Sequence, residues 1–331
     1  MSSMSKFKKL AGISAFAFAA MTMANSVNAA NWRYAHEEYE GDVQDVFAYK
    51  FKEYIEDNSD HTLQVYRFGE LGESDDIMEQ TQAGILNFVN QSPGFTGSLI
   101  PEAQIFFIPY LMPTDMDTVI EFFRTSKAIN EDFPELYAEK GLELLKMYPE
   151  GEMVVTVDEP VTQPEDFNNK KIRVMTNPLL SETYSAFGAT PTPVEVAELP
   201  TALMTGLVVG QENPLTMISA NKLWEVQSHI AMTGHMQSVL AVFVNEEVWQ
   251  GLSEEQRAAI TKVLDDEAKE SLRLATESEA KLVEELKGHG MTFTTVDNGL
   301  DIDAFRDAVL KQIRADFPAY GPYIEQIAAV E

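Results

Sequence analysis

The feature that most constrains the fold is a long helical stretch in the last third of the sequence. It begins at Leu252-Ser253-Glu254-Glu255, where Ser253 can cap the helix and acids occupy the first turn. From there to Lys287 the chain contains no proline and no glycine. This pattern predicts a helix of roughly 35 residues and about 50 Å. Helices in globular proteins are usually much shorter, so we expect this one to span two lobes.

The start of the chain alternates between strand and helix patterns. Residues 31–38 and 61–68 read as strands, and residues 41–57 between them carry apolar side chains at helical spacing. A β-α-β unit of this kind predicts parallel pairing, so the fold class is α/β. Ser74 is expected to cap the next helix, and Thr114 or Asp115 a later one. Further strands are expected at residues 85–89, 142–148, 153–157, 171–174, 239–244 and 291–296, and further helices at 134–140, 301–314 and 320–329.

The order of these elements predicts two lobes with discontinuous segments. Two consecutive strands are joined through a Pro149-Glu150-Gly151 turn, and the chain is expected to cross between lobes near residue 152. The apolar run at 239–244 is interpreted as the return. We therefore predict that lobe I comprises residues 30–152 and 240–281, that lobe II comprises 153–239 and 282–331, and that the long helix braces both.

The first 29 residues have the pattern of a cleaved export signal. Three lysines precede an apolar stretch at residues 10–23, and small residues lie at positions 27–29, where a signal peptidase would cut. A membrane anchor is the alternative, but this stretch is shorter than the roughly 20 residues that a spanning helix needs. We expect cleavage after Ala29 and a soluble mature protein in the periplasm.

Acidic residues far outnumber basic ones. The 331 residues include 53 Asp and Glu against 24 Lys and Arg, a formal charge of −29. Such a surface repels nucleic acid and anionic lipid headgroups, and salt screens its self-repulsion. We expect no nucleic-acid partner and a halophilic or halotolerant source. The chain has no cysteine, so its stability must come from a large core rather than from disulfides.

No motif for catalysis, nucleotide binding or metal binding is apparent. The five histidines lack metal-ligand spacing, and neither a glycine-rich phosphate loop nor a GxSxG elbow follows a strand in the mature chain. We therefore expect no cofactor, no metal and no enzymatic activity. Glu37 and Glu38 could serve as an acid–base pair, but in so acidic a chain paired carboxylates are interpreted by default as solvated.

The stretch from Lys170 to Pro214 has the strongest indication of a ligand site. Arg173 lies in the apolar run IRV, and Asn213 ends the run GLVVGQEN. In α/β folds such strand ends converge where small ligands bind. We predict that the two residues recognise a carboxylate. The alternative for Arg173 is a strand-edge arginine that pairs with one of the many acids.

These runs resemble the solute receptors of TRAP (tripartite ATP-independent periplasmic) transporters, the DctP-type family. The shared motifs are KIRV at 171–174, FGATPTP at 187–193 and GQENP at 210–214, and residues 68–84 and 248–260 also match. The resemblance covers the whole mature chain. It implies a type II-like, two-lobed periplasmic binding protein. It also implies that Arg173 binds a substrate carboxylate bidentately beside Asn213, and that small and large membrane subunits are the partners.

Within this family the first half of the chain is most similar to receptors for ectoine and hydroxyectoine, compatible solutes of salt-tolerant bacteria. Residues 31–48, 65–82 and 88–101 carry this similarity. It implies that Arg173 takes the ectoine carboxylate, that Glu38 takes the amidinium, and that Phe95 stacks on the ring.

The second half departs from those receptors. Where they have further aromatic side chains that close the cage, this chain has three other residues, which we expect in the pocket wall: Val196, Met217 and Ser238. The carboxylate anchor is retained, whereas stacking is reduced. Alternatives are therefore another organic acid, such as a dicarboxylate, a 2-oxo acid or a sugar acid, a receptor that serves a sensor, and a periplasmic enzyme.

Overall fold

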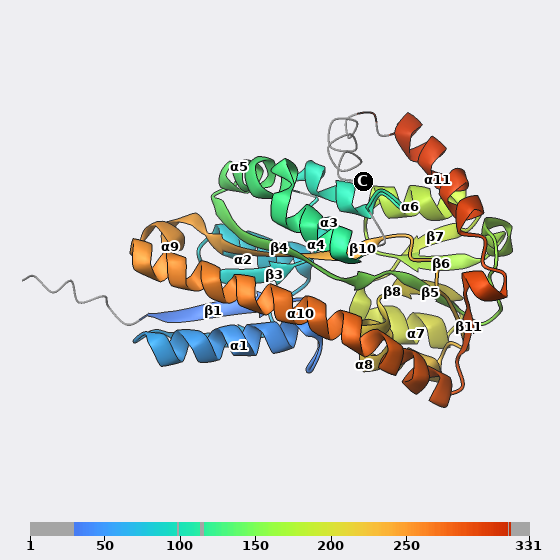
Figure 1. Cartoon of the computed structure of the whole chain (residues 1–331), viewed down its shortest axis with the longest axis horizontal. Coiled ribbons are helices and arrows are strands. Elements are labelled where there is room, and N and C mark those ends of the chain that lie inside the picture. The colour runs from blue at the N-terminus through green and yellow to red at the C-terminus, as the bar shows by residue number, and fades with distance from the viewer. Residues whose placement is uncertain (1–29, 98, 113–115, 317, 319–331) are drawn as a thin grey trace, which may run out of the picture.

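The computed structural model describes residues 30–97, 99–112, 116–316 and 318 (Figure 1). The expected export signal at 1–29, the expected caps Thr114 and Asp115 and the expected helix at 320–329 lie outside these residues. Among the helices of the described ranges, none is both long and apolar enough to cross a membrane.

One half of the molecule is built on a five-stranded sheet, sheet A, with the order β2-β1-β3-β10-β4. Its strands are β1 (Asn31–His36), β2 (Thr62–Tyr66), β3 (Phe88–Gln91), β4 (Leu142–Glu152) and β10 (Gln237–Asn245). β1 pairs in parallel with β2 and with β3, and helix α1 (Val43–Asn58) connects β1 to β2. The predicted parallel β-α-β unit is therefore confirmed. β10 joins antiparallel between β3 and β4.

The other half is built on a six-stranded sheet, sheet B, with the order β11-β9-β5-β8-β6-β7. Its strands are β5 (Val154–Val157), β6 (Lys171–Val174), β7 (Thr190–Pro193), β8 (Gly210–Asn213), β9 (His229–Ala231) and β11 (Thr292–Thr294). β6 pairs in parallel with both β7 and β8. The chain passes from sheet A to sheet B between β4 and β5, and back again between β9 and β10.

Helices cover both sheets (Figure 1). The shorter ones are α2 (Ser74–Gln82), α3 (Pro93–Thr96), α4 (Met116–Thr125), α5 (Phe133–Ala138), α6 (Pro178–Ala186), α7 (Leu199–Met204), α8 (Leu215–Ala220), α9 (Glu246–Gln250) and α11 (Ile302–Asp316). A 3-10 helix, η1 (Pro101–Phe107), and a π-helical turn, η2 (Ala128–Asp132), lie among them. α11 packs against α6 and therefore belongs with sheet B.

The long helix is present as predicted: α10 spans Glu254–Gly288, 35 residues. Ser253 caps it, because its hydroxyl accepts a hydrogen bond from the backbone N–H of Gln256 at 3.2 Å. The first turns of α10 bury Ile260 and Leu264 in the core beside sheet A, whereas Leu286 near its end is buried in the core beside sheet B. Figure 1 shows α10 running along both halves of the molecule. The prediction that it spans two lobes is therefore confirmed.

Four local predictions were wrong. Glu73, not Ser74, caps α2, since Glu73 forms a reciprocal capping box with Asp76. The third strand begins at Phe88 rather than at residue 85, after a turn. Pro149-Glu150-Gly151 does not form a turn but continues β4. Its pairing with β10 is irregular at this point, and Gly151 adopts a φ of 150° there. The apolar run at 101–113, with its three prolines, predicts a packed connector without regular structure, but residues 101–107 of it form η1.

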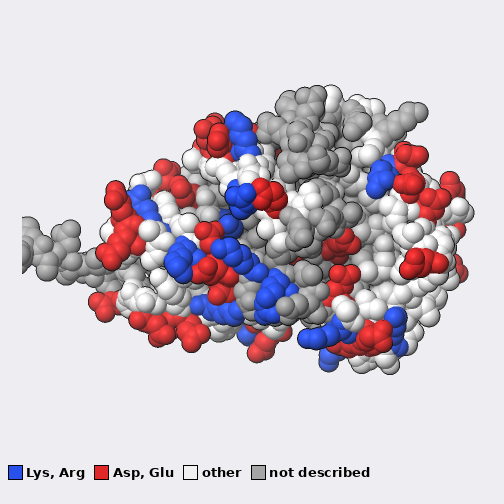
Figure 2. Space-filling model, in the orientation of Figure 1, with Lys and Arg blue, Asp and Glu red and all other residues white. Residues whose placement is uncertain are grey.

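Acidic side chains are scattered over the face shown in Figure 2 rather than gathered in one patch. Basic side chains lie among them, and several form ion pairs within a helix, such as Lys262 with Asp266 at 2.6 Å. Pairs of this exposed kind contribute little to stability. The surface therefore retains its strongly negative character.

Candidate ligand-binding site

A cavity lies where the chain passes between the two sheets. It contains about 620 Å³ of space, part of it open to solvent, and residues from both sheets line it. The structure brings together here all the residues predicted for the site: Glu38, Phe95, Arg173, Val196, Asn213, Met217 and Ser238. The two anchor residues come from sheet B, and the predicted acid and ring come from the sheet A half.

Arg173 is almost completely buried, with 1% of its surface exposed. It lies on β6, and its Nε donates a hydrogen bond to the carbonyl oxygen of Val194 at 2.8 Å. Burial lowers the pKa of Arg173 to about 10, and the charge of Glu212 opposes this shift. The guanidinium is therefore charged at neutral pH. Within the described ranges no acid forms an ion pair with it, in contrast to the alternative of a paired strand-edge arginine.

A buried hydrogen-bond network surrounds Glu212, the residue before Asn213. Its carboxylate accepts a hydrogen bond from the hydroxyl of Tyr184 at 2.9 Å and lies 2.7 Å from Nε2 of His235. Nδ1 of His235 in turn lies 2.7 Å from the hydroxyl of Thr233. This network holds the negative charge of Glu212 in a defined place, where it stabilises the charged form of Arg173. Sequence reasoning had assigned no role to Glu212, although an acid within a buried strand is a signal.

The side chain of Asn213 is positioned by its neighbour on β8 and by β5. Its amide nitrogen donates to the side-chain oxygen of Gln211, and the amide nitrogen of Gln211 donates to the hydroxyl of Thr156 at 3.0 Å. An asparagine amide has two N–H groups. One of them therefore remains for a ligand in the cavity.

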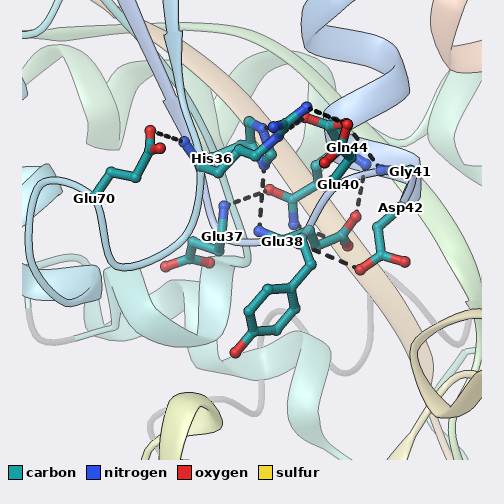
Figure 3. A network of polar contacts seen from close by, with 11 residues as sticks. His36, Glu37, Glu38, Glu40, Gly41, Asp42, Gln44 and Glu70 are labelled. Carbon is teal, nitrogen blue, oxygen red and sulfur yellow. Dashed lines mark hydrogen bonds and ion pairs between the residues drawn. The ribbon is translucent and has the colours of Figure 1, made fainter. Parts of the chain in front are cut away.

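Glu37 and Glu38 follow β1 and are buried, with 6% and 2% of their surfaces exposed (Figure 3). The expectation that they are solvated was wrong, because the start of α1 supplies donors to Glu38 and the end of β3 supplies donors to Glu37. Glu38 accepts hydrogen bonds from the backbone and side chain of Gln44 at 2.7 and 3.2 Å. Glu37 accepts from Gln91 at 2.7 Å and from the backbone of Ser92 at 2.9 Å. Burial raises the pKa of Glu37 to about 7 and that of Glu38 well above its usual range.

Glu150 is a lining residue that sequence reasoning missed. It lies on β4 with 4% of its surface exposed, and the hydroxyl of Ser238 donates to its Oε2 at 2.7 Å. Its other oxygen has no hydrogen-bond partner. The carboxyl groups of Glu150 and Glu38 are within hydrogen-bonding reach of each other. Its interpretation as part of a turn concealed it, because Pro149 and Gly151 flank it in the sequence.

Aromatic and flexible apolar side chains form the remaining walls. Phe95 reaches the cavity from α3, and Phe106 and Phe107 reach it from η1. A Cβ atom at Gly94 would lie 2.1 Å from the ring of Phe107, so only glycine leaves space for this ring. Two aromatic walls were therefore missed because they lie in the segment interpreted as an irregular connector. Four methionines complete the lining and can adapt to a ligand's shape: Met153, Met175, Met217 and Met236.

The charges of the cavity favour a ligand with both signs of charge. Arg173 is the cation among the described lining residues, whereas three acids line the cavity: Glu37, Glu38 and Glu150. Buried charges require partners. The described residues contain no group of three or more His, Cys, Asp or Glu side chains suited to a metal ion. The arrangement can therefore bind a carboxylate at Arg173 and a cationic group at the acids.

Two sheets joined by crossing strands, a long helix that braces both and a polar cavity between them define a solute receptor of the two-lobed class. Comparison with known proteins agrees with this description. The chain belongs to the DctP family, described as bacterial extracellular solute-binding protein, family 7, which matches residues 34–317. It is accordingly a periplasmic solute-binding protein, and its function is binding.

Two similar relatives have known solutes in their names. The ectoine-binding periplasmic protein TeaA of Halomonas elongata is 68% identical over 243 residues, which cover 73% of this chain and 71% of TeaA. The ectoine/5-hydroxyectoine-binding periplasmic protein UehA of Ruegeria pomeroyi is 53% identical over 249 residues, 75% of this chain and 74% of UehA.

Comparison with solved structures also finds an ectoine-binding protein among those similar to this chain. A structure of the ectoine-binding protein of the TeaABC TRAP transporter of Halomonas elongata superposes with a TM-score of 0.84. It is 56% identical and covers 91% of this chain and 98% of its own. Identity is lower over this longer match than over the 243 residues shared with TeaA. The residues outside the shorter match are therefore the less similar ones.

Proposed function

We propose that this receptor captures ectoine or hydroxyectoine and delivers it to the membrane subunits of a TRAP transporter, without carrying out a reaction on it. The observation that carries the proposal is the presence of side chains of both signs of charge in the lining of one cavity. Arg173 is positioned for the carboxylate of such a zwitterion, together with Asn213. Glu38 and Glu150 would bind its amidinium, and Phe95, which lines the same cavity, would stack on its ring. The similarity to TeaA and UehA supports the same solutes.

A dicarboxylate suits this cavity less well. Its second carboxylate would enter a region in which Glu38 and Glu150 are already buried and close together. Like charges at such distances repel strongly when water is excluded. The zwitterion instead neutralises both ends of the cavity.

Another organic acid is the second candidate for the bound solute. Val196, Met217 and Ser238 occupy positions at which ectoine receptors have aromatic side chains, by the resemblance described above, and all three line the cavity. The hydroxyl of Ser238 is engaged with Glu150. Reduced stacking on this side would suit a larger or less planar solute that has a cationic group.

Binding is coupled to closure of the lobes. The proposed lobe I (30–152 and 240–281) includes most of sheet A, and the proposed lobe II (153–239 and 282–331) includes sheet B, so a solute held by Arg173 and Glu38 connects both. Contacts of this kind exist only in the closed form and therefore shift the population towards it. The membrane subunits of the transporter, driven by an ion gradient, would then recognise the closed form.

A ligand screen by thermal shift and calorimetry tests the proposal. The mature protein is mixed at high salt with ectoine, hydroxyectoine, succinate and gluconate. A ligand at 100 times its dissociation constant adds about 2.7 kcal/mol to the free energy of unfolding. Ectoine or hydroxyectoine should give the largest upward shift of Tm. Tighter binding of succinate or gluconate than of either ectoine would contradict the proposal.

A further inference from the structure

Two buried acids share one region of the cavity without a cation between them. Glu38 follows β1 and Glu150 lies on β4. They have 2% and 4% of their surfaces exposed, and their carboxyl groups are within hydrogen-bonding reach of each other. Within the described residues neither forms an ion pair with a basic side chain. Oε1 of Glu150 also has no hydrogen-bond partner, although it is buried.

The groups around this pair add further negative charge and do not neutralise it. The charges that act most strongly on Glu38 are those of Glu150 and Asp42, both acidic. Asp42 lies just before α1, and burial raises its pKa to about 7. Tyr34 of β1 and Tyr148 of β4 also act on this region, and neither supplies a positive charge. Glu37 lines the same cavity as a further acid, and the cation among the described lining residues, Arg173, forms no ion pair with Glu38 or Glu150.

The donors that reach the pair are too few for two ionised carboxylates. Gln44 donates two hydrogen bonds to Glu38, and Ser238 donates one to Glu150. Two adjacent carboxylates in a dry environment cannot both ionise, so they commonly share one proton. With a proton on one of them, its O–H group donates to the other carboxylate.

We propose that Glu38 keeps a proton in the empty site, hydrogen-bonded to Glu150, and exchanges it for the cationic group of the solute, so that capture of a zwitterion releases one proton. This inference rests on the proposed function, because it assumes an amidinium or similar cation at this end of the cavity. It identifies Glu150 as a second specificity-determining residue for that cation.

The exchange is balanced in charge and in hydrogen bonds. The O–H bond of Glu38 breaks and the proton passes to solvent. The two carboxylates then accept N–H groups of the solute cation. The buried position that raises the pKa of Glu38 in the empty site keeps the proton there until the cation enters. Affinity should therefore increase with pH, by up to tenfold per pH unit where the empty pair holds the proton.

Proton release is measured by isothermal titration calorimetry with ectoine at pH 6. The same titration is carried out in phosphate, MES and imidazole buffers, whose ionisation enthalpies differ. The dependence of the observed heat on buffer enthalpy should give release of about one proton per solute. In Glu150→Gln the glutamine amide donates a hydrogen bond to Glu38, so that Glu38 no longer retains the proton. Binding should weaken, and proton release should fall to near zero.

A control variant lies on the same strand. Glu143→Gln removes an acid from the start of β4, far along the strand from the cavity, and should leave both affinity and proton release as in the unmodified protein. Ectoine binding to the unmodified protein without proton release would overturn the inference, whether or not Glu150→Gln folds. Release that persists in a folded Glu150→Gln protein would overturn it as well. Absence of binding by any zwitterion would instead refute the proposed function.

Discussion

Replacement of Arg173 by alanine removes the anchor on which the proposed function depends. In the structure its Nε is engaged with the carbonyl of Val194, which orients the guanidinium in the cavity. The outer nitrogens can therefore form two charge-assisted hydrogen bonds with a solute carboxylate. Each is worth about 1.5–3 kcal/mol. The loss of both predicts a decrease in affinity of roughly 10²–10⁴-fold.

The fold should survive this change. Glu212, the buried acid whose charge acts most strongly on Arg173, keeps its contacts with Tyr184 and His235 in the absence of Arg173. Circular dichroism and the Tm at high salt check that the variant is folded before affinity is compared.

Arg173→Lys is the matched control for charge. It keeps a cation in place but loses the bond to Val194 and the forked geometry, so its affinity should lie between those of the unmodified protein and the alanine variant. Calorimetry with ectoine measures all three proteins. A dissociation constant within threefold of the original for a folded Arg173→Ala protein would refute the role of this arginine. Full affinity in Arg173→Lys would show that charge alone is sufficient.

Four further predictions concern the cation end of the cavity, the pH and salt dependence of stability, and the backbone. Glu38→Gln should weaken binding of ectoine by at least tenfold but hardly affect a plain carboxylate such as succinate; calorimetry that finds equal losses would argue against the amidinium contact. Glu37 and Asp42 have pKa values raised to about 7, so the folded state holds protons that the unfolded state has lost, and stability is lost as pH rises through 7. Between the unfolded-state pKa of about 4 and the folded-state pKa of about 7, the free energy of unfolding of the ligand-free protein should fall by up to about 1.4 kcal/mol per group and pH unit; its Tm should therefore be higher at about pH 5.5 than at about pH 7.5, and a flat profile would contradict this. Gly210→Ala should destabilise the protein by about 1–3 kcal/mol in denaturant titrations, because the new Cβ would lie 2.6 Å from the carbonyl oxygen of Thr156; unchanged stability would show that β8 can shift. The charge of −29 predicts a higher Tm in molar salt than in dilute buffer, and maximal stability at low salt would count against a halophilic source.

Local sequence patterns were sufficient to predict the long helix and the first parallel strand pair. The absence of proline and glycine from 253 to 287, together with the cap at Ser253, predicted α10 correctly because helix formation depends on neighbours in sequence. The parallel pairing of β1 with β2 followed from a short β-α-β pattern. Arg173 and Asn213 were also found in this way, since each stands at the end of a recognisable strand.

The other half of the site depends on contacts between distant segments. Glu150 became visible as a lining residue only when β4 was seen to continue through Pro149 and Gly151 against β10. Phe107 reaches the cavity because Gly94, in another element, leaves room for its ring. Neither relation has a periodic signature along the chain.

The sequence by itself determined the α/β class, the bracing helix and the family, and it identified Arg173 and Asn213 as the proposed carboxylate-binding pair, because these follow from hydrophobic period, capping residues and short motifs. Only the tertiary structure decided that Glu37, Glu38 and Glu150 are buried together in a cavity and that Ser238 is engaged with Glu150. The physical reason is that burial, and with it the cost of an unpaired charge, is set by elements far apart in the chain. The two residues proposed to bind the carboxylate therefore lie in one stretch of sequence, whereas the acids proposed to bind the cationic group are brought together only by the fold.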